Sequence, residues 1–206
     1  MKKHIPLLII IAGLAILLPS LLFEKEPPLP EIPKDLKGLI IDSPARQLPE
    51  FSLIDHNNNL FDNSRFKNKW SLVFFGYTNC PDVCPTALSV LDKVSQQTGI
   101  PTQTQYVFIS VDPKRDTPEK LKGFVTYFND NFIGVSGKKN EIDKFVEPLG
   151  VIYDFEGDTQ SDDYIVNHFA AIYIIDPQGR ERAYILPPHS TKQVSQAYRL
   201  VYEHYK

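Results

Sequence analysis

The chain has 206 residues, of which 42% are hydrophobic and 23% charged, and its formal net charge is −3. These values are ordinary for one globular domain with a sizeable core, and without a basic patch nucleic acid is an unfavourable partner. Two cysteines are too few for a disulfide scaffold.

The first 23 residues predict an N-terminal transmembrane anchor. The segment 1–4 is positive, and the nineteen residues from Ile5 to Phe23 carry no charge. As a helix this run would span roughly 28 Å, about the hydrocarbon thickness of a bilayer. We favour an uncleaved anchor over a cleaved signal peptide because no clear small-x-small cleavage site follows the run. The positive end then stays in the cytoplasm, which predicts a single-pass inner-membrane protein with its soluble domain on the periplasmic side.

Residues 24–37 are predicted to be a linker between the anchor and the folded domain. Mixed charges and four prolines favour an extended, semi-rigid spacer: Pro27, Pro28, Pro30 and Pro33. The folded domain is expected to span residues 38–206.

Apolar runs and turn residues predict strands that alternate with helices through the middle of this domain. Strands are expected at 39–41, 51–54, 60–61, 71–75, 106–111, 132–135, 151–153, 170–175 and 182–186. Helices are expected from 85 to just before 99, and at 118–128, 140–149 and 191–205. Thr117 is a good N-cap for the second helix, with Pro118 at its first position. The pattern predicts an α/β domain with a mixed central sheet and helices on both faces.

Both cysteines lie in one stretch, which leaves the carboxyl end of a predicted central strand, where open α/β sheets place their sites. Cys80 and Cys84 each precede a proline, and a residue before proline is disfavoured in helical conformation. We therefore predict both cysteines in the loop, with the helix starting at Pro85. The helix N-terminus would then face the thiols and favour thiolates, which are both nucleophiles and soft metal ligands.

Three interpretations of the cysteine pair remain open on these grounds. A structural disulfide would close only a small loop, where such a bond stabilises least. A redox dithiol would reduce or oxidise partner proteins. A metal site would combine Cys80 and Cys84 with one further ligand, and two thiolates plus an imidazole suit Cu(I) or zinc.

Histidine is the natural third ligand to consider, and the chain has five. His168 lies just before the buried strand predicted at 170–175, although a histidine in such a place is more often structural than a ligand. The others lie near the chain ends or in predicted turns and loops: His4, His56, His189 and His204.

Three ordered blocks of the sequence resemble the Sco/SenC family: 75–86, 110–118 and 166–179. The resemblance implies a thioredoxin-like fold and binding of copper, as Cu(I), Cu(II) or both, through Cys80, Cys84 and His168. It implies a metallochaperone rather than an enzyme, which assists assembly of the binuclear copper centre of cytochrome c oxidase by delivering copper or reducing cysteines. The implied partners are the copper-bearing subunit of that oxidase or another copper chaperone. Asp82 matches a family position linked to partner recognition.

The chain departs from the usual family pattern at three positions near these ligands. Asn79, Asn167 and Phe169 stand where the family usually has His, Asp and Ser. None of these changes removes an implied ligand. The loss of a carboxylate beside His168 is expected to alter the surroundings of its ring, which tune the basicity of a metal-bound imidazole.

Two enzyme families are rivals to this interpretation. A thiol oxidoreductase of the thioredoxin type has two residues between its cysteines, where this chain has three, and a proline facing the thiols, where this chain has Asn167 and His168. A peroxiredoxin has Thr three residues before its reactive cysteine, where this chain has Pro81. We favour metal handling, with thiol–disulfide reductase activity of Cys80 and Cys84 as the alternative. The acidic segment 154–163 is expected to move, so that His168 can join or leave the site.

Overall fold

The structure is a computed structural model that describes residues 26–206. The predicted transmembrane anchor at 1–23 lies outside the described residues. Among residues 26–206, no helix is both long and apolar enough to cross a membrane. The anchor and the periplasmic location of the domain therefore stay predictions.

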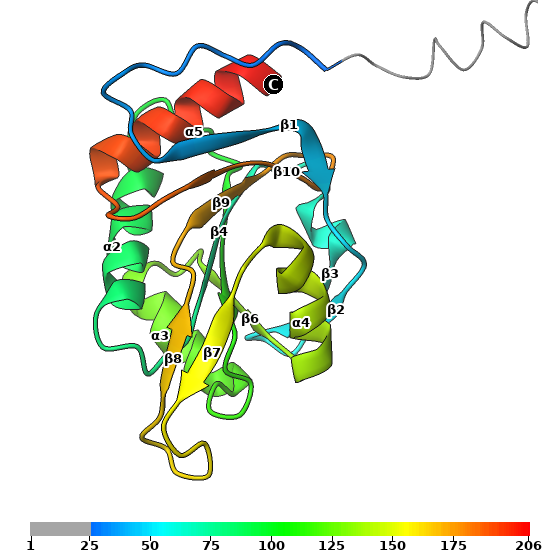
Figure 1. The fold of residues 1–206 in the computed structure, drawn as a ribbon, viewed down its shortest axis with the longest axis vertical. Helices are drawn as coiled ribbons and strands as arrows, with labels where there is room; N and C mark the ends of the chain where they lie inside the picture. Colours follow the sequence, from blue (N-terminus) through cyan, green and yellow to red (C-terminus); the bar gives the residue numbers. More distant parts are fainter. Residues whose placement is uncertain (1–25) are drawn as a thin grey trace, which may run out of the picture.

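An eight-stranded mixed sheet forms the centre of the domain, in the order β1-β10-β9-β4-β5-β6-β2-β3 (Figure 1). Its strands are β1 Leu39–Gln47, β2 Ser52–Asp55, β3 Leu60–Asp62, β4 Ser71–Gly76, β5 Gln105–Ser110, β6 Ile133–Ser136, β9 Ile172–Ile175 and β10 Arg180–Ile185. The three central strands β4, β5 and β6 run parallel to one another, and the remaining pairs are antiparallel. Every residue of β4 and β5 is buried, as uninterrupted apolar runs in a central sheet predict.

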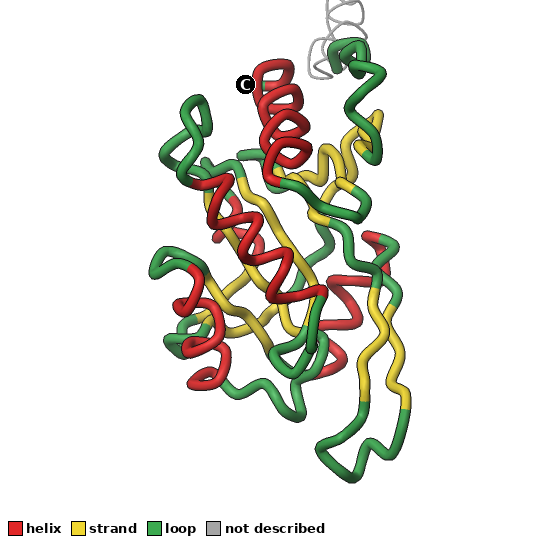
Figure 2. Tube along the Cα trace, turned by 90° about the vertical axis from the view of Figure 1, so that its left-hand side faces the viewer, coloured by secondary structure: helices red, strands yellow, loops and turns green. Residues whose placement is uncertain are grey.

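Helices cover both faces of this sheet, which confirms the predicted α/β architecture. They are α2 Val83–Ser95, α3 Pro118–Phe128, α4 Lys139–Val146 and α5 Thr191–Tyr205, with short 3-10 helices at η1 Asn63–Phe66 and η2 Glu147–Leu149. Figure 2 shows α5, α2 and α3 on the side of the sheet that faces the viewer, while α4 lies behind it. The predicted cap of α3 is confirmed, since the Thr117 side chain accepts a hydrogen bond from the backbone N–H of Lys120.

A two-stranded antiparallel hairpin, formed by β7 Tyr153–Glu156 and β8 Ile165–His168, projects from the main sheet (Figures 1 and 2). The predicted strand at 151–153 was wrong, because strand structure begins at Tyr153 and runs into the acidic segment. The side chains of Asp154 and Glu156 are exposed, whereas Tyr153 and Phe155 are half-buried and pack against the core. This alternation has the period of two that a strand imposes, and it was masked in the sequence by the density of acidic residues.

The described part of the predicted linker lies against the domain. The Glu26 carboxylate is 2.9 Å from the Arg182 guanidinium and 3.4 Å from that of Arg180, both on β10. The His204 imidazole, on α5, is hydrogen-bonded to the backbone oxygen of Pro28 at 2.7 Å. These contacts hold the chain along one side of the domain before β1 begins.

Candidate metal centre

Cys80 and Cys84 lie between the carboxyl end of β4 and the first turn of α2. The helix begins at Val83, so Cys84 is a helical residue and only Cys80 remains in the loop. The prediction that both cysteines precede the helix was therefore wrong for Cys84. A helix tolerates Pro85 in its first turn because the first four backbone N–H groups have no partner inside the helix, so none is lost.

The two thiols have opposite electrostatic environments. The neighbouring Cys84 side chain, with help from His168 and nearby backbone N–H groups, lowers the pKa of Cys80 to about 3 against the opposing effect of burial. The backbone N–H of Cys84 lies 3.5 Å from the Cys80 Sγ, so the start of α2 faces that sulfur. The neighbouring Cys80 side chain, together with burial, raises the pKa of Cys84. Cys80 is thus a half-buried thiolate, and Cys84 is a buried thiol.

The third side chain comes from the last residue of β8, 84 residues after Cys84. The His168 Nε2 lies 3.5 Å from the Cys84 Sγ. The rings of Phe74 and Tyr77 pack edge-on against the imidazole, with centroids 5.9 and 6.2 Å away. The buried Nδ1 of His168 has no hydrogen-bond partner. One ring nitrogen therefore faces the sulfurs, while aromatic side chains limit the freedom of the ring.

The ligand atoms of Cys80, Cys84 and His168 all lie within 4.8 Å of one another. Cys84 is buried and the other two are half-buried, so the group is reachable from one side. Two sulfurs and one imidazole are soft or borderline donors, which suit Cu(I) or zinc better than a hard ion such as Mg²⁺. The residues present therefore fit a soft metal ion.

The other histidines among the described residues take part in structural contacts instead. The His56 Nδ1 accepts a hydrogen bond from the backbone N–H of Gly134 at 2.9 Å, and the His189 Nε2 lies 3.0 Å from the backbone oxygen of Ile185. Asp82 is exposed at the start of α2, and its side chain caps no helical N–H. An exposed carboxylate beside the cysteines is compatible with contact to a partner, and it is no part of the three-residue group.

The sequence offered little sign of a buried carboxylate beside the cysteine loop. Asp116 is 2% exposed and accepts hydrogen bonds from the backbone N–H and the hydroxyl of Thr78, at 2.9 and 2.6 Å, and from the hydroxyl of Ser110 at 2.6 Å. Burial raises its pKa. Its one signal in the sequence was its place in the second resembling block, 110–118.

The comparison with protein families identifies the chain. The SCO1/SenC family model matches residues 41–203. The chain belongs to the SCO1/SenC family. A SCO2-like protein of Rickettsia prowazekii is 34% identical over 154 residues, which are 72% of this chain and 74% of the relative.

Two solved structures show the same fold as this SCO1/SenC protein. One is Arabidopsis thaliana ScoI with copper bound, which is 28% identical with a TM-score of 0.70 and covers 77% of this chain and 99% of its own. The other is Bradyrhizobium japonicum ScoI with copper bound, which is 31% identical with a TM-score of 0.66 and covers the same shares of both chains, 77% and 99%. The thioredoxin-like domain expected from the resemblance is confirmed by this agreement.

The departures from the usual SCO1/SenC pattern have contacts of their own. The Asn79 Oδ1 accepts a hydrogen bond from the Lys120 Nζ at 2.5 Å. Asn167 lies directly opposite Asp154 in the hairpin, and its Nδ2 donates to Asp154 at 3.3 Å and to Glu156 at 3.2 Å. The amide of Asn167 thus separates two carboxylates on the outer face of the strand pair that carries His168.

Restoring the family's usual acid in this SCO1/SenC protein is expected to weaken the hairpin. Asn167→Asp places a third carboxylate directly across from Asp154, and like charges opposite each other destabilise a strand pair by up to about 1 kcal/mol. The measurement is the free energy of unfolding in denaturant. Because 1 M salt shortens the screening length to about 3 Å, the deficit of Asn167→Asp should shrink there. The control is Asn167→Ser, which removes the same amide without adding a charge. If both variants lose the same free energy of unfolding, and salt does not change that loss, the electrostatic explanation is contradicted.

Proposed function

We propose that this protein is a membrane-anchored copper metallochaperone that binds copper through Cys80, Cys84 and His168. The observation that carries the proposal is the convergence of two sulfurs and one imidazole, from segments 84 residues apart, to within 4.8 Å. It is supported by two relatives that share the fold and whose structures contain copper. In this role copper is cargo that the site takes up and releases.

Each of the three side chains has a distinct part in holding this cargo. Cys80 is half-buried, so its sulfur can be reached from outside, and its lowered pKa favours the thiolate. Cys84 is buried, and its raised pKa favours the protonated thiol, which must lose its proton when the sulfur becomes a metal ligand. His168 closes the third side from a separate strand. Copper supplies a soft cation that the two sulfurs prefer over water or carboxylate.

The recipient that we propose is the binuclear copper centre of cytochrome c oxidase, reached either directly or through another copper chaperone. This assignment rests on membership of the SCO1/SenC family. The proposed location is the periplasmic side of the inner membrane, which rests on the positive N-terminus and the uncharged run from Ile5 to Phe23.

Thiol–disulfide exchange is a second candidate function, and the different environments of the two thiols support it. A half-buried thiolate next to a buried thiol is the arrangement of a nucleophilic and a resolving cysteine. This function leaves the placement of His168 unexplained, because an imidazole facing the sulfurs serves a metal better than a peptide substrate. Copper carriage accounts for all three side chains.

An anaerobic Cu(I) titration of the full-length protein in detergent tests the copper proposal. We expect one copper per chain, and an affinity that falls at least about tenfold in His168→Ala and further in Cys80→Ser or Cys84→Ser. His204→Ala is the matched control, since that imidazole contacts the Pro28 backbone oxygen. Undiminished binding by His168→Ala would remove it from the ligand set. Rapid reduction of a copper-free partner disulfide, without tight copper binding, would favour the thiol–disulfide function.

A further inference from the structure

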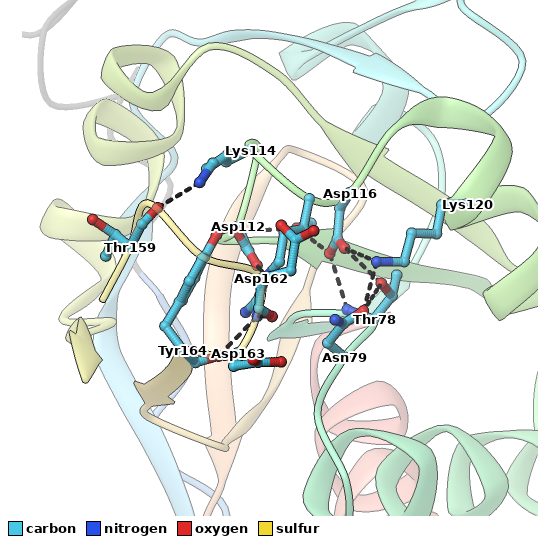
Figure 3. Close-up of polar contacts among 12 residues, drawn as sticks. Thr78, Asn79, Asp112, Lys114, Asp116, Lys120, Thr159, Asp162, Asp163 and Tyr164 are labelled. Atoms are coloured by element: carbon cyan, nitrogen blue, oxygen red, sulfur yellow. Dashed lines mark hydrogen bonds and ion pairs between the residues drawn. The ribbon is translucent and has the colours of Figure 1, made fainter. Parts of the chain in front are cut away.

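The turn between β5 and α3 contacts both segments that supply the metal ligands. Asp116, in this turn, accepts two hydrogen bonds from Thr78, which lies two residues before Cys80 (Figure 3). The carboxylate is 2% exposed, so these bonds form away from water, where leaving the groups unpaired is costly. Thr78 therefore connects the cysteine loop to the turn between β5 and α3.

The neighbouring residue, Arg115, holds the other segment. Its guanidinium Nη1 donates to the backbone oxygens of Asp162 and Tyr164, both at 2.8 Å. Its Nε donates to the Asp112 carboxylate at 2.5 Å, and the other oxygen of that carboxylate accepts from the Tyr164 hydroxyl at 2.5 Å. Figure 3 shows Asp112, Asp162 and Tyr164 gathered at this point. Tyr164 immediately precedes β8, so these bonds fix the start of the strand that ends at His168.

Stacking adds a second connection between Arg115 and the imidazole. The Arg115 guanidinium carbon lies 3.5 Å from the centroid of the Tyr164 ring and 5.4 Å from that of Tyr77. Tyr77 in turn packs edge-on against His168, with centroids 6.2 Å apart. Arg115 thus contacts Tyr164, which directly precedes the strand that carries His168. It also lies over the ring of Tyr77, which limits the rotation of the His168 imidazole.

We propose that Arg115 is the positioning residue of the metal centre. It fixes the distance between the His168 imidazole and the sulfurs of Cys80 and Cys84. The inference rests on the proposed function, because it assigns Arg115 a role in the same copper site. His168 is carried by a two-stranded hairpin, and such a hairpin is marginally stable by itself. Its position therefore depends on what ties it to the main sheet. The planar fork of arginine can hold two carbonyls in fixed geometry, whereas a lysine ammonium keeps the charge without the fork.

This arrangement restricts how the acidic segment 154–163 can move. Lys114 donates to the backbone oxygen of Thr159, and Arg115 donates to that of Asp162. If the hairpin moves away from the main sheet and takes His168 away from the sulfurs, the hydrogen bonds from Arg115 to the backbone oxygens just before β8 must break. The hydrogen bonds of Arg115 therefore decide whether the hairpin stays attached to the main sheet.

A purely structural role for Arg115 makes a different prediction. A guanidinium beside the buried Asp112 would stabilise the whole domain, and its loss would weaken copper binding equally with or without the imidazole. A residue that acts through His168 affects copper binding only while His168 is present. The difference is an interaction between two substitutions, which a double-mutant cycle measures.

The test compares four full-length proteins in detergent: wild type, Arg115→Lys, His168→Ala and the double variant. Cu(I) affinity is measured anaerobically by competition with a chromophoric chelator. We expect Arg115→Lys to lower affinity about tenfold in the wild-type background and less than about twofold in the His168→Ala background. Arg65→Lys is the matched control, since Arg65 lies 3.5 Å from another buried carboxylate, Asp55, and it should leave the affinity unchanged.

Two further measurements keep the test decisive. Tyr164→Phe removes only the hydroxyl bond to Asp112, and we expect a smaller loss of affinity that also disappears in the His168→Ala background. In the copper-free protein, Arg115→Lys should accelerate amide hydrogen exchange in β8 at least tenfold while β4 stays protected.

The outcomes separate this inference from the proposed function. Equal losses in both backgrounds, or an unchanged affinity in Arg115→Lys, would overturn the positioning role and leave the copper site intact. Unchanged exchange in β8 would likewise count against it. A wild-type affinity that does not depend on His168 would overturn the proposed ligand set and, with it, the role of Arg115.

Discussion

Replacing Gly76 with alanine is expected to destabilise the protein by about 1–3 kcal/mol and to weaken Cu(I) binding at least tenfold. Gly76 is the last residue of β4, beneath the buried thiol. A Cβ at this position would lie 2.5 Å from the Cys84 Sγ and 3.0 Å from the Phe108 ring. The 2.5 Å distance is too short for non-bonded atoms, so the Cys84 sulfur must shift, and the 3.0 Å distance is tight enough that the Phe108 ring must give by a few tenths of an ångström.

Gly123→Ala is the control for this substitution. Gly123 lies within α3, and a Cβ there would meet nothing within 4 Å. Because alanine favours a helix over glycine by about 0.5–1 kcal/mol, this variant should be slightly more stable and bind copper normally. Unfolding followed by the fluorescence of Trp70, the single tryptophan, measures the stability of both variants. A Gly76→Ala protein with wild-type stability and copper affinity would contradict the close packing beneath Cys84.

Buried Glu181 is expected to contribute progressively less to the stability of the folded protein as pH rises from about 4.5 to about 8. This residue of β10 is fully buried, and neither carboxylate oxygen has a hydrogen-bond partner. Burial, reinforced by the nearby Asp42 carboxylate, raises the pKa of Glu181 to about 8, although Arg46 opposes the shift from 3.5 Å away. On β9, Tyr173 is the other titratable group close to it.

The direction follows from where the proton is bound in each state. Below about pH 4.5 Glu181 is protonated whether the chain is folded or unfolded, so its raised pKa costs nothing. Between that value and about 8 the unfolded chain loses the proton while the folded chain retains it, which favours unfolding progressively. Since one pKa unit corresponds to about 1.4 kcal/mol, the loss across this window is about 3–5 kcal/mol.

Glu181→Gln should remove this pH dependence. At pH 5 the variant and the wild type should have similar free energies of unfolding, because glutamine resembles the protonated acid. At pH 8.5 the variant should be more stable by several kcal/mol, as measured by denaturant unfolding. Glu203→Gln, at an exposed position of α5, should show no such difference. If the free energies of unfolding of Glu181→Gln and wild type differ by the same amount at both pH values, a protonated Glu181 is refuted.

Local patterns in the sequence predicted most of the elements of the fold correctly. The apolar run of β4 and the Thr117 cap of α3 each depend on a few consecutive residues, so their signals survive without knowledge of the fold. The start of α2 was misplaced because a residue before proline is disfavoured in a helix in general, yet tolerated in its first turn. The strand β7 was misplaced because its buried face becomes visible only when it packs against the core.

The cysteine pair, its place after a central strand and its capacity for thiolate chemistry were all readable from consecutive residues. The choice of His168 came from likeness to a family, since nothing local distinguishes a ligand histidine from a structural one. The approach of His168 to the sulfurs and the contacts that Arg115 and Asp116 make with both ligand-bearing segments depend on residues far apart in the chain. The opposite pKa shifts of Cys80 and Cys84 depend on burial in the folded protein. Such distances and burial exist only once the chain has folded, because hydrogen bonding and desolvation depend on neighbours that sequence order does not specify.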